Sequence, residues 1–290
     1  MITKDMHVMV QGITGKEGSR ATKEMLDYGA KVTCGVTPGK GGQEVEGKPV
    51  FNTVEEAVKF DSKLEATVCF VPPLFLYGAA KEALDAGIKL IVIISENVPV
   101  QDSAKLIEEA KEKGATILGP ASVGIIKVGE MKLGSIGSEE RMYTKGNVAI
   151  VSKSGGMCGE TALLLSQNKI GQSICVGIGG DQILGTSFTD MFEILEKDKD
   201  TKVIVMYGEI GGQYEEEAAK MIKKMNTPVV AFISGQFAEK VGREVAMGHA
   251  GAILEKGSGS AAQKKKVLKN AGVYVANYHD EIVDIVKKLV

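Results

Sequence analysis

Short apolar segments alternate along the chain with longer segments in which apolar residues recur at helical spacing. In the N-terminal part, the apolar segments predict strands over residues 7–12, 31–36, 66–72, 89–95 and 115–120. The segments between them predict helices over residues 19–29, 53–60, 78–88 and 103–114, with Thr53 as an N-cap. Strands that are apolar throughout are typical of a parallel sheet covered by helices on both faces. The pattern therefore predicts a doubly wound α/β domain.

The alternation stops over residues 121–147, which have no clear periodicity and which we interpret as an interdomain segment. It then resumes with predicted strands over residues 148–154, 173–180, 202–212, 228–235 and 273–277. Predicted helices cover residues 157–168, 188–198, 214–225, 260–272 and 279–290. A chain of 290 residues has room for two such α/β domains with parallel sheets, and we place the first over residues 1–122 and the second over residues 123–290.

Composition narrows the classes of function. The chain has 35 Lys and Arg against 37 Asp and Glu, a formal net charge of −2, which excludes a broad basic surface for nucleic acid. We interpret the lysine run at 264–266 as a solvated helix face. No segment approaches the ~18 consecutive apolar residues of a membrane span, and the N-terminus lacks a secretory signal. Four widely spaced cysteines favour buried thiols in a reducing cytoplasm over disulfides or a zinc site, so we predict no metal site.

A glycine-rich loop follows the first predicted strand. The chain has 36 glycines, which indicate many tight turns or close approaches of backbone to a ligand. Gly12, Gly15 and Gly18 stand at G-x-x-G-x-x-G spacing before the first predicted helix. This spacing is related to that of dinucleotide-binding loops, in which glycines allow close backbone approach and the helix N-terminus attracts a phosphate. A tight strand-to-helix turn without a ligand is the alternative interpretation.

The loop after the second predicted strand bears on the choice of ligand. An NAD-binding domain carries an acidic residue there, which holds the ribose 2′-hydroxyl. Here the predicted glycine-rich loop, residues 37–50, has Lys40 instead. A lysine attracts an additional phosphate, so the loop favours coenzyme A, which carries a 3′-phosphate, or NADP over NAD.

Three glycine-rich turns follow strands of the second domain, at residues 152–156, 177–181 and 208–212. The carboxyl ends of parallel strands lie at one edge of a sheet, so we expect these turns to converge on a ligand. In the first turn, Ser154, Gly155 and Gly156 precede a helix, and the amides at a helix N-terminus suit an anion.

One of the 3 histidines is a candidate catalytic residue. His7 is predicted to be structural and His279 to lie on the surface, whereas His249 stands in a Gly-His-Ala-Gly-Ala segment with little steric cover. An imidazole near a carboxylate is suited to nucleophilic attack on phosphorus. Glu209 is the expected orienter, because a carboxylate that accepts the Nδ1 proton leaves Nε2 free to attack. A structural histidine and a solvent-facing turn glutamate are the alternatives.

Six motifs stand in the order typical of one enzyme family: GITGKEG, GVTPGKGG, VGIGGD, GEIGG, YEEEA and GHAGAI. In these motifs the chain resembles the α subunit of succinyl-CoA synthetase and its relatives over essentially its whole length. The resemblance implies a Rossmann-like CoA-binding domain followed by a flavodoxin-like ligase domain. It also implies that His249 is phosphorylated during turnover, that Glu209 stabilises the phosphohistidine, and that Ser154, Gly155 and Gly156 bind the phosphoryl group.

The same resemblance implies the ligands and the partner. It places the CoA contacts at Gly15, Lys16, Glu17, Gly18, Lys40, Val71, Pro72, Ser95 and Glu96. It implies a β-type partner subunit with an ATP-grasp domain that holds ATP and Mg²⁺, in a cytoplasmic hetero-oligomer. The implied enzyme is an acid–thiol ligase, which joins a carboxylic acid to CoA through phospho-His249 and an acyl phosphate and releases ADP and phosphate.

Three segments depart from the succinate type, namely residues 119–124, 152–160 and 238–247. They are instead similar to ATP-citrate lyase and citryl-CoA synthetase. Gly156 stands where the succinate type has threonine, which leaves more room beside the phosphoryl site and suits a bulkier tricarboxylate. We therefore expect citrate to be the favoured acid, with succinate as the alternative. The chain ends at Val290, without the lyase domain that is fused in ATP-citrate lyase, and this favours a synthetase subunit.

Two functions of other classes remain as alternatives. A non-catalytic CoA-binding module would keep the features of the first domain, but it has no reason to hold both His249 and Glu209. An NAD(P)-linked dehydrogenase would use a similar first domain, but Lys40 and the lack of a catalytic pair near that domain oppose it.

Overall fold

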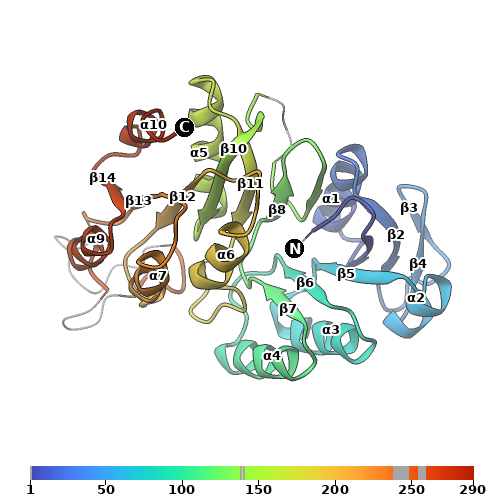
Figure 1. Cartoon of the computed structure of the whole chain (residues 1–290). Coiled ribbons are helices and arrows are strands. Elements are labelled where there is room, and N and C mark those ends of the chain that lie inside the picture. Colours follow the sequence, from blue (N-terminus) through green and yellow to red (C-terminus); the bar gives the residue numbers. More distant parts are fainter. Residues whose placement is uncertain (1, 138, 140, 238–247, 254–258) are drawn as a thin grey trace. The chain divides into compact units, whose positions relative to one another are not determined.

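The computed structural model describes residues 2–137, 139, 141–237, 248–253 and 259–290 (Figure 1). The chain divides into two compact units. The first comprises Met1–Ser138 and Ile183–Gly185, and the second comprises Glu139–Gln182 and Thr186–Val290. The boundary between residues 122 and 123 that we derived from the sequence stays a prediction.

The first unit is built on a sheet of strands β1 (His7–Gln11), β2 (Lys31–Val36), β3 (Glu44–Val45), β4 (Lys48–Phe51), β5 (Leu64–Cys69), β6 (Leu90–Ile93) and β7 (Thr116–Leu118). Its helices are α1 (Lys16–Asp27), α2 (Val54–Phe60), α3 (Pro73–Asp85) and α4 (Val100–Glu112). The strand order is β3-β4-β2-β1-β5-β6-β7, and only the β3–β4 pair is antiparallel. Apart from β3, this is the order of a Rossmann fold, with its switch point between β1 and β5. The predicted fold of this unit is therefore confirmed.

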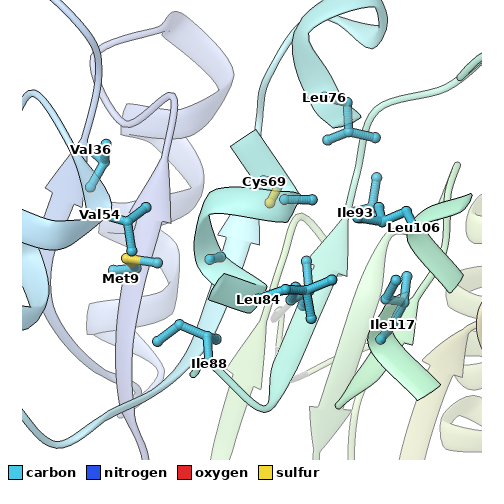
Figure 2. Close-up of a cluster of buried hydrophobic side chains, with 14 of the residues drawn as sticks. Met9, Val36, Val54, Cys69, Leu76, Leu84, Ile88, Ile93, Leu106 and Ile117 are labelled. Carbon is cyan, nitrogen blue, oxygen red and sulfur yellow. The ribbon is translucent and has the colours of Figure 1, made fainter. Parts of the chain in front are cut away.

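Helices α2, α3 and α4 bury one face of this sheet. Figure 2 shows that face, where the buried side chains drawn come from the strands (Met9, Cys69, Ile93, Ile117) and from the helices (Val54, Leu76, Leu84, Leu106). Val8 and Val10, the neighbours of Met9 in β1, point to the opposite face and are also fully buried. A strand buried on both faces has to be apolar throughout, which explains the pattern in the sequence.

The glycine-rich loop at residues 37–50 contains two strands that we did not predict. Strands β3 and β4 form a hairpin, and β4 joins the sheet beside β2. The turn between them is made by Glu46 and Gly47, whose φ angles are 50° and 71°. Two successive positive φ angles match the twist of a tight hairpin. A strand of two residues carries too little periodicity to be recognised in the sequence.

Residues 121–147, which we interpreted as a linker or interdomain segment, include the boundary between the two units but also contain regular structure. They contain an antiparallel hairpin of β8 (Gly124–Lys127) and β9 (Met131–Leu133). Within it, a Cβ atom on Gly124 would lie 1.9 Å from the carbonyl oxygen of Leu133, so only glycine fits there. The hairpin packs on α1, and the fully buried Lys132 places Nζ 2.9 Å from Glu24 Oε2.

The second unit contains strands β10 (Lys145–Ser152), β11 (Gln172–Gly177), β12 (Val203–Gly208), β13 (Val229–Ile233) and β14 (Tyr274–Ala276). Its described helices are α5 (Gly155–Gln167), α6 (Phe188–Leu195), α7 (Tyr214–Ile222), α9 (Ala261–Asn270) and α10 (Glu281–Val286). Within this unit the parallel strands follow in the order β14-β13-β12-β10-β11. This is the flavodoxin-like order, with its switch point between β10 and β12, so the predicted fold is confirmed. Helices cover both faces of the sheet (Figure 1).

The histidines outside the candidate site have structural surroundings. His7 is structural, as predicted, with Nδ1 2.7 Å from Asp61 Oδ2. His279 was predicted to lie on the surface, but its ring is half-buried and packs edge-on against Tyr207 and Phe232. Tyr207 belongs to β12 and Phe232 to β13, so the polar sequence around His279 gave no sign of this contact.

The lysine run at 264–266 is not a fully solvated face. Lys264 is completely buried; its Nζ donates a hydrogen bond of 2.5 Å to the carbonyl oxygen of Gly211 and pairs with the Glu215 carboxylate. Lys266 alone in this run is fully on the solvent side. The four cysteines are free and buried. In the described part of the chain, no helix is both long and apolar enough to cross a membrane.

Candidate functional site

The glycine loop of the first unit is tightly packed between β1 and α1. A Cβ atom on Gly12, whose φ is +79°, would lie 2.3 Å from the Phe70 carbonyl oxygen. A Cβ atom on Gly18 would lie 2.3 Å from the Gly12 carbonyl oxygen. Gly15 is the N-cap of α1, and its amide donates to the same Gly12 oxygen at 3.0 Å. Both Gly12 and Phe70 follow strands at the switch point, where Rossmann folds bind their ligands.

A cavity of 490 Å³ opens at the carboxyl ends of β1, β2 and β5. Its lining is mostly apolar, and its volume lies within the range of small-molecule sites. Of the nine predicted CoA contacts, Val71 and Pro72 line it, together with Gly12 of the loop. Gln11, also in the lining, donates from Nε2 to the Ala79 carbonyl oxygen at 2.8 Å.

Lys40 lies on an exposed loop whose base lines the cavity. The loop is held by Asn52, whose Oδ1 accepts hydrogen bonds from the amides of Gly39 at 2.9 Å and Gly41 at 3.0 Å. The Lys40 amide donates to the Thr37 carbonyl oxygen at 3.0 Å. Asn52 thereby fixes the backbone on both sides of Lys40. Sequence reasoning missed this residue, because it follows β4 and no motif connects it with the loop.

The remaining predicted CoA contacts are more dispersed. The Ser95 hydroxyl donates to the Val71 carbonyl oxygen, which ties the loop after β6 to the loop after β5. Lys16 and Glu17 are exposed in the first turn of α1, and Glu17 pairs with Arg20 of the same helix. Glu96 is exposed after β6. Their roles in CoA binding stay predictions.

In the second unit, the structure brings the two predicted catalytic residues together. His249 Nδ1 lies 2.6 Å from Glu209 Oε2. Glu209 directly follows β12 and is buried, whereas the His249 side chain is 34% exposed. The imidazole is therefore held by the carboxylate at Nδ1, and its ring is partly exposed.

The turn after β11 packs against the same imidazole. A Cβ atom on Gly180 would lie 2.6 Å from His249 Cγ. The Gly180 carbonyl oxygen accepts a hydrogen bond of 2.9 Å from the Gly251 amide, which fixes the histidine segment on this turn. The predicted convergence of glycine-rich turns therefore holds for the turns after β11 and β12.

Lys153, the residue after β10, completes the cluster. Its side chain is 1% exposed, and its Nζ lies 3.2 Å from Glu209 Oε1. Burial opposes ionisation of Glu209, but the hydrogen bond with His249 and the charge of Lys153 outweigh it and lower the pKa of the carboxyl. Glu209 is therefore a carboxylate at neutral pH. We assigned no role to Lys153 from the sequence, although its place directly after a strand was a usable signal.

A second buried pair holds the Glu209 loop. The Glu209 amide donates to Glu215 Oε1 at 3.0 Å, and Glu215 pairs through its other oxygen with Lys264. Lys264 also holds the Gly211 carbonyl oxygen. Both charged side chains are fully buried. The backbone around Glu209 is thus fixed by charge-assisted hydrogen bonds that do not involve His249.

Ser154, Gly155 and Gly156 follow Lys153 and begin α5. Ser154 is the N-cap, and its Oγ accepts a hydrogen bond of 3.3 Å from the Met157 amide. The first amides of a helix have no partners within it and attract anions. A Cβ atom on Gly156 would meet nothing within 4 Å. Binding of a phosphoryl group here stays a prediction, and the described residues contain no cluster suited to a metal ion.

Comparison with known proteins identifies the family of the chain. Residues 3–97 match the CoA binding domain family, and residues 151–274 match the CoA-ligase family. The chain is 46% identical to the succinate–CoA ligase (ADP-forming) subunit alpha 2 of Archaeoglobus fulgidus, over 97% of this chain and 96% of the relative. This chain belongs to the succinate–CoA ligase α-subunit family. Another member, the α subunit from Methanothermobacter thermautotrophicus, is 45% identical over 99% of this chain and 96% of its own.

Solved structures show the same fold. The ATP citrate lyase of Methanosaeta concilii, in complex with (3S)-citryl-CoA, matches 100% of this chain with a TM-score of 0.91 at 25% identity. This chain spans 50% of the length of that protein. The dinucleotide-forming acetyl-coenzyme A synthetase 1 of Ca. Korarchaeum cryptofilum matches 98% of this chain and 60% of its own, with a TM-score of 0.78 at 22% identity. The family and the two-part α/β architecture predicted from the motifs are confirmed.

Proposed function

We propose that the chain is the α subunit of an ADP-forming acid–CoA ligase and that it carries a phosphoryl group on His249. The observation that supports this most is the 2.6 Å contact between His249 Nδ1 and the buried Glu209 carboxylate. A carboxylate that accepts the Nδ1 proton fixes the tautomer in which Nε2 has a free lone pair. A partly exposed imidazole held in this way is suited to attack on phosphorus.

Different residues of the chain act at different steps of the reaction. Nε2 of His249 attacks the γ-phosphorus of ATP, the P–O bond to ADP breaks, and its electron pair leaves with ADP. Ser154, Gly155 and Gly156 hold the phosphoryl group at the start of α5. A carboxylate oxygen of the acid then attacks phosphorus, and the N–P electron pair returns to Nε2. When bound, CoA supplies the thiol that takes the acyl group from the acyl phosphate and releases phosphate.

The first unit fits CoA in its chemistry. Gly12 of the glycine loop lines the cavity and leaves room there for a ligand, and Val71 and Pro72 provide an apolar wall. Lys40 supplies a positive charge near the cavity for the 3′-phosphate. ATP and Mg²⁺ are held by a β-type partner subunit with an ATP-grasp domain, and the two chains form a hetero-oligomer in the cytoplasm.

Succinate is the first candidate for the acid. The relatives named above are succinate–CoA ligase α subunits, and their similarity extends over almost the whole of both chains. These likenesses weigh more than the three segments that led us to expect citrate from the sequence. One of those segments, residues 238–247, lies outside the described residues.

Citrate is the second candidate, for one specific reason. The position of Gly156 beside the candidate phosphoryl site is open, so a larger acid has room there. The citryl-CoA complex of ATP citrate lyase has the same fold over the whole of this chain, which is consistent with this choice.

Phosphorylation tests the proposed function. Incubated with the β-type subunit and ATP, the chain is expected to acquire an acid-labile, base-stable phosphate. The variant His249→Asn is expected to acquire none, and His279→Asn, which alters a histidine outside the site, is expected to label normally. Undiminished labelling of His249→Asn would contradict the assignment, as would a wild-type complex that never labels.

A substrate panel then identifies the acid. CoA-dependent formation of ADP is measured with succinate, citrate and malate for the wild type and for Gly156→Thr. If succinate is the substrate, the wild type prefers succinate and the variant keeps that preference. If citrate is the substrate, the wild type prefers citrate and the added side chain lowers the ratio of citrate to succinate turnover.

A further inference from the structure

Lys153 and Glu209 meet at the switch point of the second sheet. Strands β10 and β12 are parallel neighbours in which Ser152 lies beside Tyr207, so the residues that follow them emerge side by side. The Lys153 amide donates to the Tyr207 carbonyl oxygen at 3.0 Å, which fixes the lysine backbone to the end of β12. Glu209 lies two residues after Tyr207 and directly follows β12. The topology therefore brings this lysine and this glutamate together at the edge where ligands bind.

We propose that Lys153 is a positioning residue that keeps Glu209 ionised and thereby selects the tautomer of His249 that can be phosphorylated. This inference rests on the proposed function of His249. It adds a residue that touches neither the phosphoryl group nor the acid and that acts through Glu209 alone.

The two oxygens of Glu209 have separate partners. Oε2 is 2.6 Å from His249 Nδ1, and Oε1 is 3.2 Å from Lys153 Nζ. Oε1 is buried and accepts no hydrogen bond from any described residue, so the ammonium group is its compensating contact. Without Lys153, this oxygen would be a buried partial charge with nothing opposite it. Such a group becomes protonated more easily.

The other charged groups near Glu209 do not replace Lys153. Glu215 holds the Glu209 backbone amide, but its charge is negative and is already matched by Lys264. Burial raises the pKa of Tyr207, and the negative charge of Glu209 raises it further, so this hydroxyl stays neutral. On the side of His249, the neighbouring turn supplies only Asp181, a further carboxyl group. Among the described residues around Glu209, Lys153 is therefore the cation that faces its carboxylate.

Ionisation of Glu209 decides which nitrogen of His249 is nucleophilic. An ionised carboxylate only accepts, so Nδ1 carries the proton and Nε2 keeps its lone pair. A protonated carboxyl group donates from Oε2, so Nδ1 becomes the acceptor and a neutral imidazole must carry its proton on Nε2. That tautomer has no lone pair at the attacking nitrogen. Loss of the lysine charge thus changes the chemistry of His249 without touching it.

Lys153 is itself held in place. Its side chain is buried, and its Nζ lies 5.6 Å from the centre of the Tyr214 ring, at the start of α7. A cation over an aromatic face is stabilised by the ring. The ammonium group of Lys153 thus has two partners inside the unit, the Tyr214 ring and the Glu209 carboxylate.

The test compares Lys153→Met, which removes the charge, with Lys153→Arg, which keeps it. The complex with the β-type subunit is given ATP, and the rate of His249 phosphorylation is followed from pH 5.5 to pH 8.5. For Lys153→Met we expect a loss of about tenfold or more at pH 5.5 that shrinks as the pH rises, because Glu209 then ionises without help. Lys153→Arg is expected to follow the wild-type profile. Lys266→Met, on the exposed side of α9, is the matched control.

Carboxyl NMR of Glu209 in the isolated chain gives a second readout that requires no turnover. The titration midpoint of Glu209 is expected to rise by about one pH unit or more in Lys153→Met relative to the wild type. A rate that falls equally at every pH, or an unchanged midpoint in a folded variant, would overturn the inference. A wild-type complex that never labels would overturn the proposed function instead, and the Glu209 midpoint would still decide the role of Lys153.

Discussion

Gly180 packs so closely against His249 that a Cβ atom at position 180 would lie 2.6 Å from the imidazole Cγ. The same glycine accepts a hydrogen bond from the Gly251 amide, two residues after the histidine. Gly180 therefore both makes room for the ring and anchors the segment that carries it. The imidazole is confined between this turn on one side and the Glu209 carboxylate on the other.

Gly180→Ala is expected to displace His249 without unfolding the unit. The added methyl group pushes the ring away from its contact with Glu209, and a shift of about 1 Å at a reacting group lowers the rate by ~100-fold. Single-turnover phosphorylation by ATP measures the effect, with thermal unfolding as the control for stability. A folded variant that phosphorylates at the wild-type rate would contradict the role of this contact.

The fold was predictable because its sheets are buried on both faces. Strands buried on both faces are made mainly of apolar residues, as in β12 and in the three central positions of β1, and helices of regular length separate them. The hairpin of β8 and β9 escaped prediction because its strands are short and its close packing depends on Gly124, whose lack of a side chain leaves no pattern.

The site was predictable in part, since Glu209 and His249 both stand in glycine-rich segments and Glu209 directly follows a strand. Their contact joins residues 40 positions apart, and only the topology of the sheet places them together. The supporting residues were not predictable. Lys264 looks like part of a solvated lysine run, and the carboxylate that explains its burial, Glu215, lies 49 positions earlier.

Lys40→Ala is expected to weaken binding of CoA about fivefold and to leave binding of dephospho-CoA unchanged. The reason is that an exposed ammonium group facing a phosphate contributes a modest, screened attraction, and dephospho-CoA lacks the 3′-phosphate. Asn52→Ala, which releases the amides of Gly39 and Gly41, should act in the same direction. Calorimetric titration of both ligands measures the two affinities. An equal loss of affinity for CoA and dephospho-CoA would mean that Lys40 does not contact the 3′-phosphate.

Lys264→Met is expected to destabilise the second unit by about 3–5 kcal/mol, because it leaves the fully buried Glu215 carboxylate without its partner. Adding Glu215→Gln should recover part of the loss, since the amide oxygen can still accept from the Glu209 amide. Urea unfolding measures both changes. Lys266→Met, on the exposed side of the same helix, is the control and should change stability by less than ~0.5 kcal/mol. A loss below ~0.5 kcal/mol for Lys264→Met would mean that the buried pair of Lys264 and Glu215 contributes nothing to stability.

His279 is expected to make the stability of the second unit depend on pH. The Thr161 hydroxyl donates its hydrogen to the Met157 carbonyl oxygen. Its Oγ1 lies 2.9 Å from His279 Nε2 and therefore accepts a hydrogen bond from that nitrogen, which carries the ring proton. Burial lowers the pKa of His279 below its usual 6.5, against the opposing charges of Glu160 and Asp280. As the pH falls through about 6.5, the unfolded chain takes up a proton that the folded chain refuses, and stability is lost.

The variant His279→Gln keeps a donor for Thr161 but does not titrate. From pH 7.5 to pH 5.5, the melting temperature of the wild type should fall by about 2–4 °C more than that of the variant. His7 and His249 are common to both proteins, so their contributions cancel in the difference. Parallel curves would mean that His279 binds its proton equally well in the folded and unfolded chain, and that its packing against Tyr207 and Phe232 leaves it accessible to solvent.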